Sequence, residues 1–123
     1  MGDRCCLSIK VLPTRELTEL ENTNIENAGA PMSEMVADYV DLEEMNYAGY
    51  YLREELEKAD VAYHVTWGSG SGYGPGAAVH HPSEGVVEVE MSFNGDLMVQ
   101  YPLLPDDVAH VERYIKLVET YFP

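Results

Sequence analysis

The sequence predicts a single α+β domain, in which an antiparallel-rich sheet of about four strands carries its helices on one face. Three observations support this prediction. The chain has 123 residues, a length that suits one domain and leaves little room for two. Several segments alternate apolar and polar residues with the period of a half-buried strand. Others space their apolar residues as an amphipathic helix does. Because no linker or internal repeat divides residues 1–123, we expect one acidic domain.

The chain is expected to open with a strand, a short helix and a loop. Residues 4–12 alternate between apolar and polar side chains, which indicates a half-buried strand. Thr14 is the expected N-cap of a short helix that ends at Glu21. Residues 22–30 are rich in Asn and Gly, and we expect them to form a loop.

The next stretch is expected to be helical. Pro31 suits the first turn of a short helix that extends to Val40. Asp41 stands three residues before Glu44, and this pattern resembles a capping box at the start of a longer helix that ends at Lys58. One continuous helix fits the same pattern equally well.

The second half of the chain is expected to contain strands, with one helix at its end. In order, the sequence predicts a strand at 61–67, a glycine-rich loop at Gly68–Gly76, a strand at 77–80, a strand at 86–93, a tight turn at Asn94-Gly95, a return strand at 96–101 and a helix that begins at Pro105. The sheet face away from the helices is expected to be wet and to carry Ser8, Lys10, His64, Thr66, Glu88 and Glu90.

Charge limits the classes of partner. The chain has 22 Asp and Glu against 7 Lys and Arg, a formal net charge of −15. Such a charge argues against direct binding to DNA, RNA or an anionic membrane, because all three favour Lys and Arg. It fits a basic partner. Apolar residues make up 46 %, enough to build a core, so disorder through low hydrophobicity is not expected.

The cysteines and the N-terminal residues indicate the compartment. Cys5 and Cys6 are adjacent and are the only cysteines, so the chain has no disulfide framework. The sequence opens without the pattern of a secretory signal. No apolar stretch approaches the ~20 residues of a membrane span. We therefore expect a cytoplasmic protein with free thiols.

An acidic stretch is the strongest candidate for a binding site. Nine carboxylates and no Lys or Arg occur from Glu16 to Glu44. If residues 31–45 are helical, three of the carboxylates form a stripe about 5.4 Å apart, comparable with roughly 3.4 Å per phosphate along a nucleic-acid strand. A solvated face or a metal site are the alternatives. The expected contacts for a cationic partner are Glu34, Asp38, Asp41, Glu43 and Glu44, with Glu16 and Glu19 as a second row.

Tyrosines beside this stretch are candidate anchors. Tyr47, Tyr50 and Tyr51, with Tyr39, form either an aromatic contact patch or part of the core. In the glycine-rich loop, Tyr73 is the expected contact if the loop binds a partner. The alternative is a mobile connection between strands.

The histidines and the glycine-rich loop carry only weak signals of chemistry. His64 is a candidate general base or a surface residue paired with a carboxylate. His80 and His81 are adjacent, so in an extended segment they point apart, and no metal-ligand spacing accompanies them. Gly68–Gly76 lacks the Lys-Ser/Thr of a phosphate-binding loop. We expect no metal and no cofactor.

In size and charge the chain is similar to phage-encoded inhibitors of bacterial defence, including anti-CRISPR and anti-restriction proteins. The similarity is one of composition and not of motifs. It implies a non-enzymatic inhibitor, active in the host cytosol, that docks an acidic surface on a basic nucleic-acid-binding protein. The alternatives are an immunity protein against a basic toxin, a small enzyme or nucleotide binder that uses Gly68–Gly76 and His64, and a subunit that oligomerises through its tyrosines. The sequence leaves the oligomeric state open.

Overall fold

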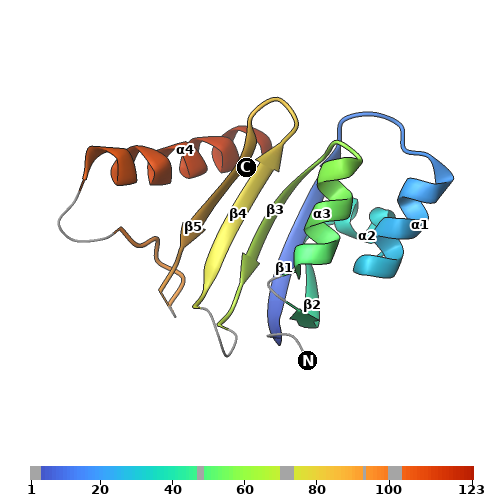
Figure 1. Cartoon of the computed structure of the whole chain (residues 1–123), viewed down its shortest axis with the longest axis horizontal. Helices are drawn as coiled ribbons and strands as arrows, with labels where there is room; N and C mark the ends of the chain where they lie inside the picture. The colour runs from blue at the N-terminus through green and yellow to red at the C-terminus, as the bar shows by residue number, and fades with distance from the viewer. Residues whose placement is uncertain (1–3, 47–48, 70–73, 93, 100–103) are drawn as a thin grey trace.

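A computed structural model of the chain describes residues 4–46, 49–69, 74–92, 94–99 and 104–123. These residues form one antiparallel sheet of five strands in the order β2-β1-β3-β4-β5 (Figure 1). The elements in chain order are β1 (Arg4–Pro13), α1 (Glu19–Ala28), α2 (Met32–Ala37), β2 (Val40–Asn46), α3 (Tyr50–Lys58), β3 (Val61–Trp67), β4 (Gly76–His81), β5 (Gly85–Glu90) and α4 (Pro105–Tyr121). The predicted α+β class and the antiparallel sheet are confirmed.

Helices cover both faces of the sheet. Alternate residues of β3 point to opposite faces. Tyr63 and Val65 share a core with Leu56 of α3, whereas Ala62 shares a second core with Leu117 of α4. We call the first side the three-helix face, because α1, α2 and α3 contribute to its core, and the second side the α4 face. The prediction that all helices pack on one face is therefore wrong.

The sheet face predicted to be wet does not exist as a unit. His64 lies on the α4 face and is only 9 % exposed. Ser8, Lys10 and Thr66 are partly buried on the same face. Glu88 lies on the three-helix face, where it pairs with Arg53 of α3. Glu90, two residues further along β5, is on that face too.

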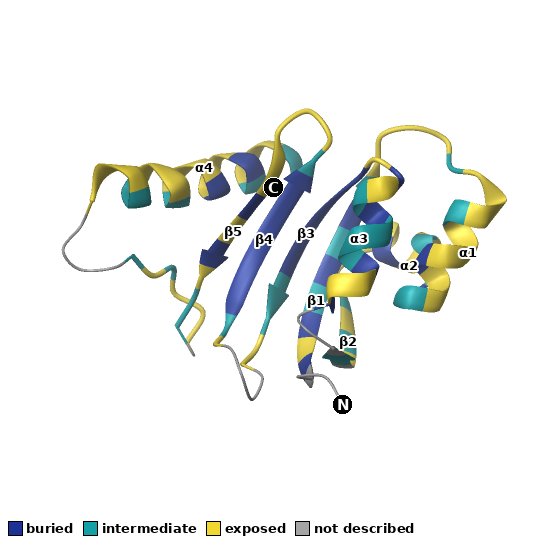
Figure 2. Ribbon diagram, in the orientation of Figure 1, coloured by how far each residue is buried: buried dark blue, intermediate teal, exposed yellow. Residues whose placement is uncertain are grey.

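The two cores lie at opposite ends of the sheet. Ile9 and Val11 of β1 are fully buried on the three-helix face, while Val87 of β5 is buried on the α4 face. Figure 2 shows that β3 and β4 are buried over most of their length, whereas α1 is largely exposed. Each helical layer therefore leaves part of its face uncovered, and the uncovered parts lie at opposite margins of the sheet.

The first helix begins later than predicted and replaces the predicted loop. Its N-cap is Thr18, whose side chain accepts a hydrogen bond from the N–H of Glu21 at 3.1 Å. The Glu21 carboxylate accepts one from the N–H of Thr18 at 2.9 Å, which completes a capping box. Thr14 caps no helix, and its hydroxyl donates to the carbonyl of Asp60. Ile25 is fully buried, so tertiary packing holds this Asn-rich segment helical.

The predicted long helix is in fact a strand followed by a shorter helix. Residues from Val40 pair with β1, and the register shifts within this pairing between Cys5 and Leu7. Gly49 then adopts φ 73° at the start of α3, a left-handed conformation that favours glycine and interrupts any continuous helix. The short helix predicted after Pro31 is present as α2, but it ends at Ala37 and not at Val40, which is the first residue of β2.

The end of β5 reverses direction where the sequence predicts a turn. The amide of Ser92 donates to the carbonyl of Asp96 at 2.8 Å, and Gly95 adopts φ 85°. This pairing of Ser92 with Asp96 differs from the two-residue turn that Asn94-Gly95 predicts. Of the predicted return strand, the described part makes a single bridge between Met91 and Leu97. The predicted C-terminal helix is confirmed as α4.

We expect Thr18→Ala to lower the free energy of unfolding by about 1 kcal/mol, because it leaves an amide at the start of α1 without its acceptor. Thr23→Ala, within the exposed part of the same helix, is the matched control and is expected to cause no loss. Urea denaturation followed by circular dichroism measures both. Equal effects of the two substitutions would contradict the capping role of Thr18.

Candidate functional site

Exposed carboxylates gather at one end of the sheet, which we call the acidic end. Every one of these side chains is exposed. Figure 1 shows α1, α2 and β2 together, away from α4. The acidic end consists of Glu16 before α1, Glu19 and Glu26 in α1, Glu34 in α2, Asp38 at the C-cap of α2, and Asp41 and Glu43 in β2.

The structure does not form the predicted helical stripe of carboxylates. Helix α2 ends at Ala37 and β2 begins at Val40, so Glu34, Asp38 and Asp41 do not share one helix. The argument from a spacing of one helical turn therefore fails. The backbone of Glu44 is in β2, but its side chain lies outside the described residues.

Three of the paired cations lie away from the acidic end, and the fourth, Arg15, is paired with Glu21 and Asp60. Within the described residues, four of the seven Lys and Arg make ion pairs. The pairs are Arg15 with Glu21 and Asp60, Arg53 with Glu88, Lys58 with Glu54 and Glu55, and Arg113 with Glu84. Of the eight carboxylates in the acidic stretch whose side chains are described, Glu21 alone takes part, and hydrogen bonds from Arg15 lower its pKa to about 2. The acidic end thus keeps its negative charge without an internal counter-ion among these pairs.

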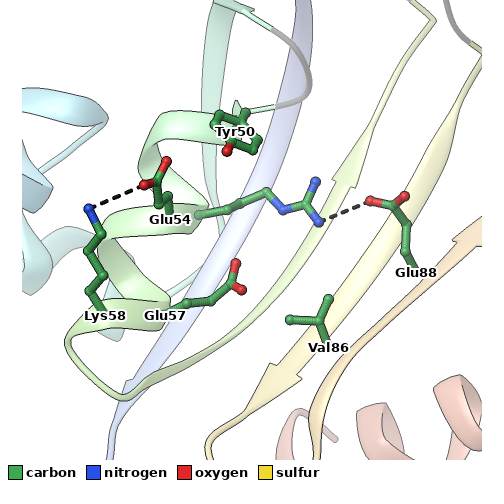
Figure 3. A pocket seen from close by; sticks show the side chains of 7 residues that line it. Tyr50, Glu54, Glu57, Lys58, Val86 and Glu88 are labelled. Atoms are coloured by element: carbon green, nitrogen blue, oxygen red, sulfur yellow. Dashed lines mark hydrogen bonds and ion pairs between the residues drawn. The ribbon is translucent and has the colours of Figure 1, made fainter.

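A groove opens where α1–α3 leave the three-helix face uncovered (Figure 3). It lies between α3 and the β4–β5 margin and has a volume of about 640 Å³. Its lining residues are Tyr50, Arg53, Glu54, Glu57, Lys58, Val86 and Glu88. Three carboxylates and two cations therefore meet in it.

Arg53 crosses the groove and is held on several sides. Its Nη2 lies 3.0 Å from a carboxylate oxygen of Glu88, and its Nε donates to the hydroxyl of Tyr63 at 3.2 Å. The guanidinium also stands 5.1 Å from the ring centroid of Trp67. The Tyr63 hydroxyl in turn donates to Glu57 at 2.9 Å. Because these groups satisfy one another, they join α3 to the sheet.

One exposed tyrosine, Tyr50, lines this groove, and a second, Tyr51, packs against it. Tyr50 is 55 % exposed and Tyr51 is 60 % exposed, and their rings meet edge to face with centroids 5.5 Å apart. The structure thus places Tyr50 as an exposed aromatic side chain beside charged residues. The candidates Tyr47 and Tyr73 lie outside the described residues.

His64 forms a buried polar cluster that the sequence did not indicate. Its Nδ1 lies 2.7 Å from the hydroxyl of Tyr39, and its Nε2 lies 2.8 Å from that of Tyr114. Burial lowers the pKa of His64 to about 4 and raises that of Tyr114 to about 12. The imidazole is therefore neutral at pH 7, with one nitrogen donating and the other accepting. Because the tyrosines occupy both nitrogens, the ring is not placed as a surface general base.

His80, His81 and the glycine-rich loop have structural surroundings. His80 is buried, with Nδ1 2.9 Å from the carbonyl of Val61, and His81 stacks on Tyr121 at 4.0 Å. The loop Gly68–Gly76 joins β3 to its antiparallel neighbour β4, not a strand to a helix N-terminus as phosphate-binding loops do. Among the residues that the structure describes, no three His, Cys, Asp or Glu gather to hold a metal ion.

Comparisons with protein-family models, with curated proteins and with solved structures found no match. Within the described residues, the helices are too short or too polar to cross a bilayer.

We expect acid to destabilise the wild-type protein more than His64→Phe. The folded pKa of about 4 lies below the ordinary value near 6.5, so the unfolded chain binds a proton first as pH falls. The contribution of the neutral His64 imidazole to the free energy of unfolding is fully present above pH 6.5 and is lost as pH falls toward 4. Between pH 7 and 4, the wild type should lose about 3 kcal/mol more than the variant.

Urea denaturation at several pH values measures this difference. Tyr39→Phe removes one hydroxyl but keeps the buried imidazole, so it should retain the wild-type loss in acid. Parallel pH profiles for wild type and His64→Phe would show that His64 is not a buried neutral imidazole.

Proposed function

We propose that this chain is a non-enzymatic binding protein that docks its acidic end on a basic, nucleic-acid-binding surface of a partner protein. One observation carries the proposal. Exposed carboxylates concentrate over α1, α2 and β2, while the ion pairs that hold Arg53, Lys58 and Arg113 lie elsewhere in the chain. A surface kept negative in this way favours encounter with a positive one.

The aromatic side chains supply a second part of the proposed interface. Helix α3 begins shortly after β2 ends, so the exposed Tyr50 and Tyr51 follow the acidic strand closely along the chain. Interfaces often combine a few aromatic anchors with a charged rim, in which the anchors provide most of the affinity. The carboxylates would then control the rate of association and its dependence on salt.

The proposed action is inhibition by occupation of the partner's nucleic-acid site. A basic groove that binds phosphates also attracts carboxylates, so the acidic end and a nucleic acid would exclude each other there. Similarity in size and charge to phage anti-defence proteins supports this choice, since many of those proteins block such surfaces. An immunity protein against a basic toxin would use the same physics, and the identity of the partner separates the two.

We expect reversal of two charges, Asp38→Lys with Asp41→Lys, to weaken partner binding at least about tenfold, mainly through slower association. The test begins with capture from host lysate at low salt, stepwise salt elution and mass spectrometry. Binding of the purified partner is then measured against salt concentration, together with its nucleic-acid binding.

The matched control is Glu112→Lys with Glu119→Lys on the exposed surface of α4, which changes the net charge by the same amount at the other end of the sheet. It should bind the partner nearly as the wild type does. Equal weakening by both pairs would mean that net charge alone acts. A smear of basic proteins released by modest salt would contradict a specific partner.

A further inference from the structure

The two margins of the sheet differ in the hydrogen-bond partners of their outward backbone groups. Along β5, side chains and the following segment occupy the outer carbonyls. His110 Nε2 donates to the carbonyl of Glu88 at 2.6 Å, and Arg113 donates to that of Glu84 at 2.6 Å. The amide of Met98 donates to the carbonyl of Glu90 at 3.1 Å. Helix α4 and the return segment thus occupy much of this margin.

The margin formed by β2 has no such cover within the described residues. Strand β2 pairs with β1 alone. The carbonyl of Cys6 accepts a hydrogen bond from Gly68 and so faces β3. Since backbone groups of a strand alternate in direction, those of Leu7 and Ile9 face β2 and meet their partners there. The partners of Leu7 and Ile9 on β2 are Leu42 and Val40. Asp41 lies between these two residues, so its N–H and C=O point away from β1.

Charge decides what can pair with this margin. The side chains of Asp41 and Glu43 are both exposed on β2. A second copy of β2 would bring like charges together, so the chain resists pairing with itself. An extended segment with alternating Lys or Arg would meet opposite charges along the same margin.

We propose that the outer margin of β2 takes an extended cationic segment of a partner protein as a sixth strand of the sheet. Backbone hydrogen bonds to the outward groups of Asp41 would supply affinity, and Lys or Arg side chains beside Asp41 and Glu43 would supply specificity. This inference rests on the proposed function, because it states how the acidic end engages its partner. The register shift opposite Cys5 and Leu7 limits the pairing to a short segment around Asp41.

The probe is a short synthetic peptide in which Lys alternates with Val. Its control is the same peptide methylated at every backbone nitrogen, which keeps charge and side chains but cannot donate to a strand. Fluorescence anisotropy at low salt measures both affinities. We expect the methylated peptide to bind at least tenfold more weakly, and Asp41→Lys with Glu43→Lys to weaken the unmethylated peptide by at least tenfold.

Amide hydrogen exchange locates the added strand. The N–H of Asp41 should exchange at least tenfold more slowly when the unmethylated peptide is bound. Val86 is the matched control, because it faces outward on β5 as its neighbour Glu88 does, and its exchange should not change. Equal slowing at Asp41 and Val86 would overturn the assignment to β2.

The outcomes separate this inference from the proposed function. If both peptides bind equally and charge reversal weakens both, strand addition is wrong while acidic docking stands. If charge reversal on β2 weakens neither the peptide nor the natural partner, both proposals are wrong. A preference for the unmethylated peptide, with Asp41 protected, supports both.

Discussion

Burial of β3 on both of its sides is the constraint on which the rest of the structure depends. Its first five residues, Val61–Val65, are all buried, because α3 packs on one face and α4 on the other. A strand enclosed in this way carries no exposed charge of its own. Exposed charge therefore lies on the outer strands β2 and β5, and within the described residues only the β2 margin lacks hydrogen-bond partners of the kind seen along β5. The position of the acidic end follows from this layering.

The same constraint explains the arrangement around His64. An imidazole on a strand buried on both sides loses its contact with water, and that loss costs free energy unless both nitrogens find hydrogen-bond partners. Tyr39 reaches it from the segment just before β2, and Tyr114 reaches it from α4. The polar cluster thus connects the acidic end to the helix on the same face. Its role is to join the layers, which a pattern of single histidines in the sequence does not reveal.

Local pattern was sufficient for some elements and misleading for others. Strict alternation predicts β1, β3 and β5, and Pro105 predicts the start of α4. The sequence pattern does not predict β2 because its pairing is irregular: two of its residues stand opposite Cys6, so the inward residues Leu42 and Met45 are three apart. That spacing is the one a helix uses, and only pairing with β1 distinguishes the two. The sequence analysis misplaces α1 because it takes Thr14 as the N-cap, whereas the cap is Thr18, whose capping partner Glu21 is visible in the sequence.

The acidity of the candidate site could be predicted from composition, but its shape could not. The number of carboxylates does not depend on the fold. Their arrangement in space does, because it changes with whether Asp41 belongs to a helix or to a strand at the sheet margin. On a marginal strand, a carboxylate acts in two ways through one charge. It repels a second copy of the same strand, as Lys does on many natural sheet margins. Unlike Lys, it also attracts a cationic strand. The sign of the charge on β2 therefore disfavours pairing with a second copy and, in the proposed complex, favours a cationic partner strand.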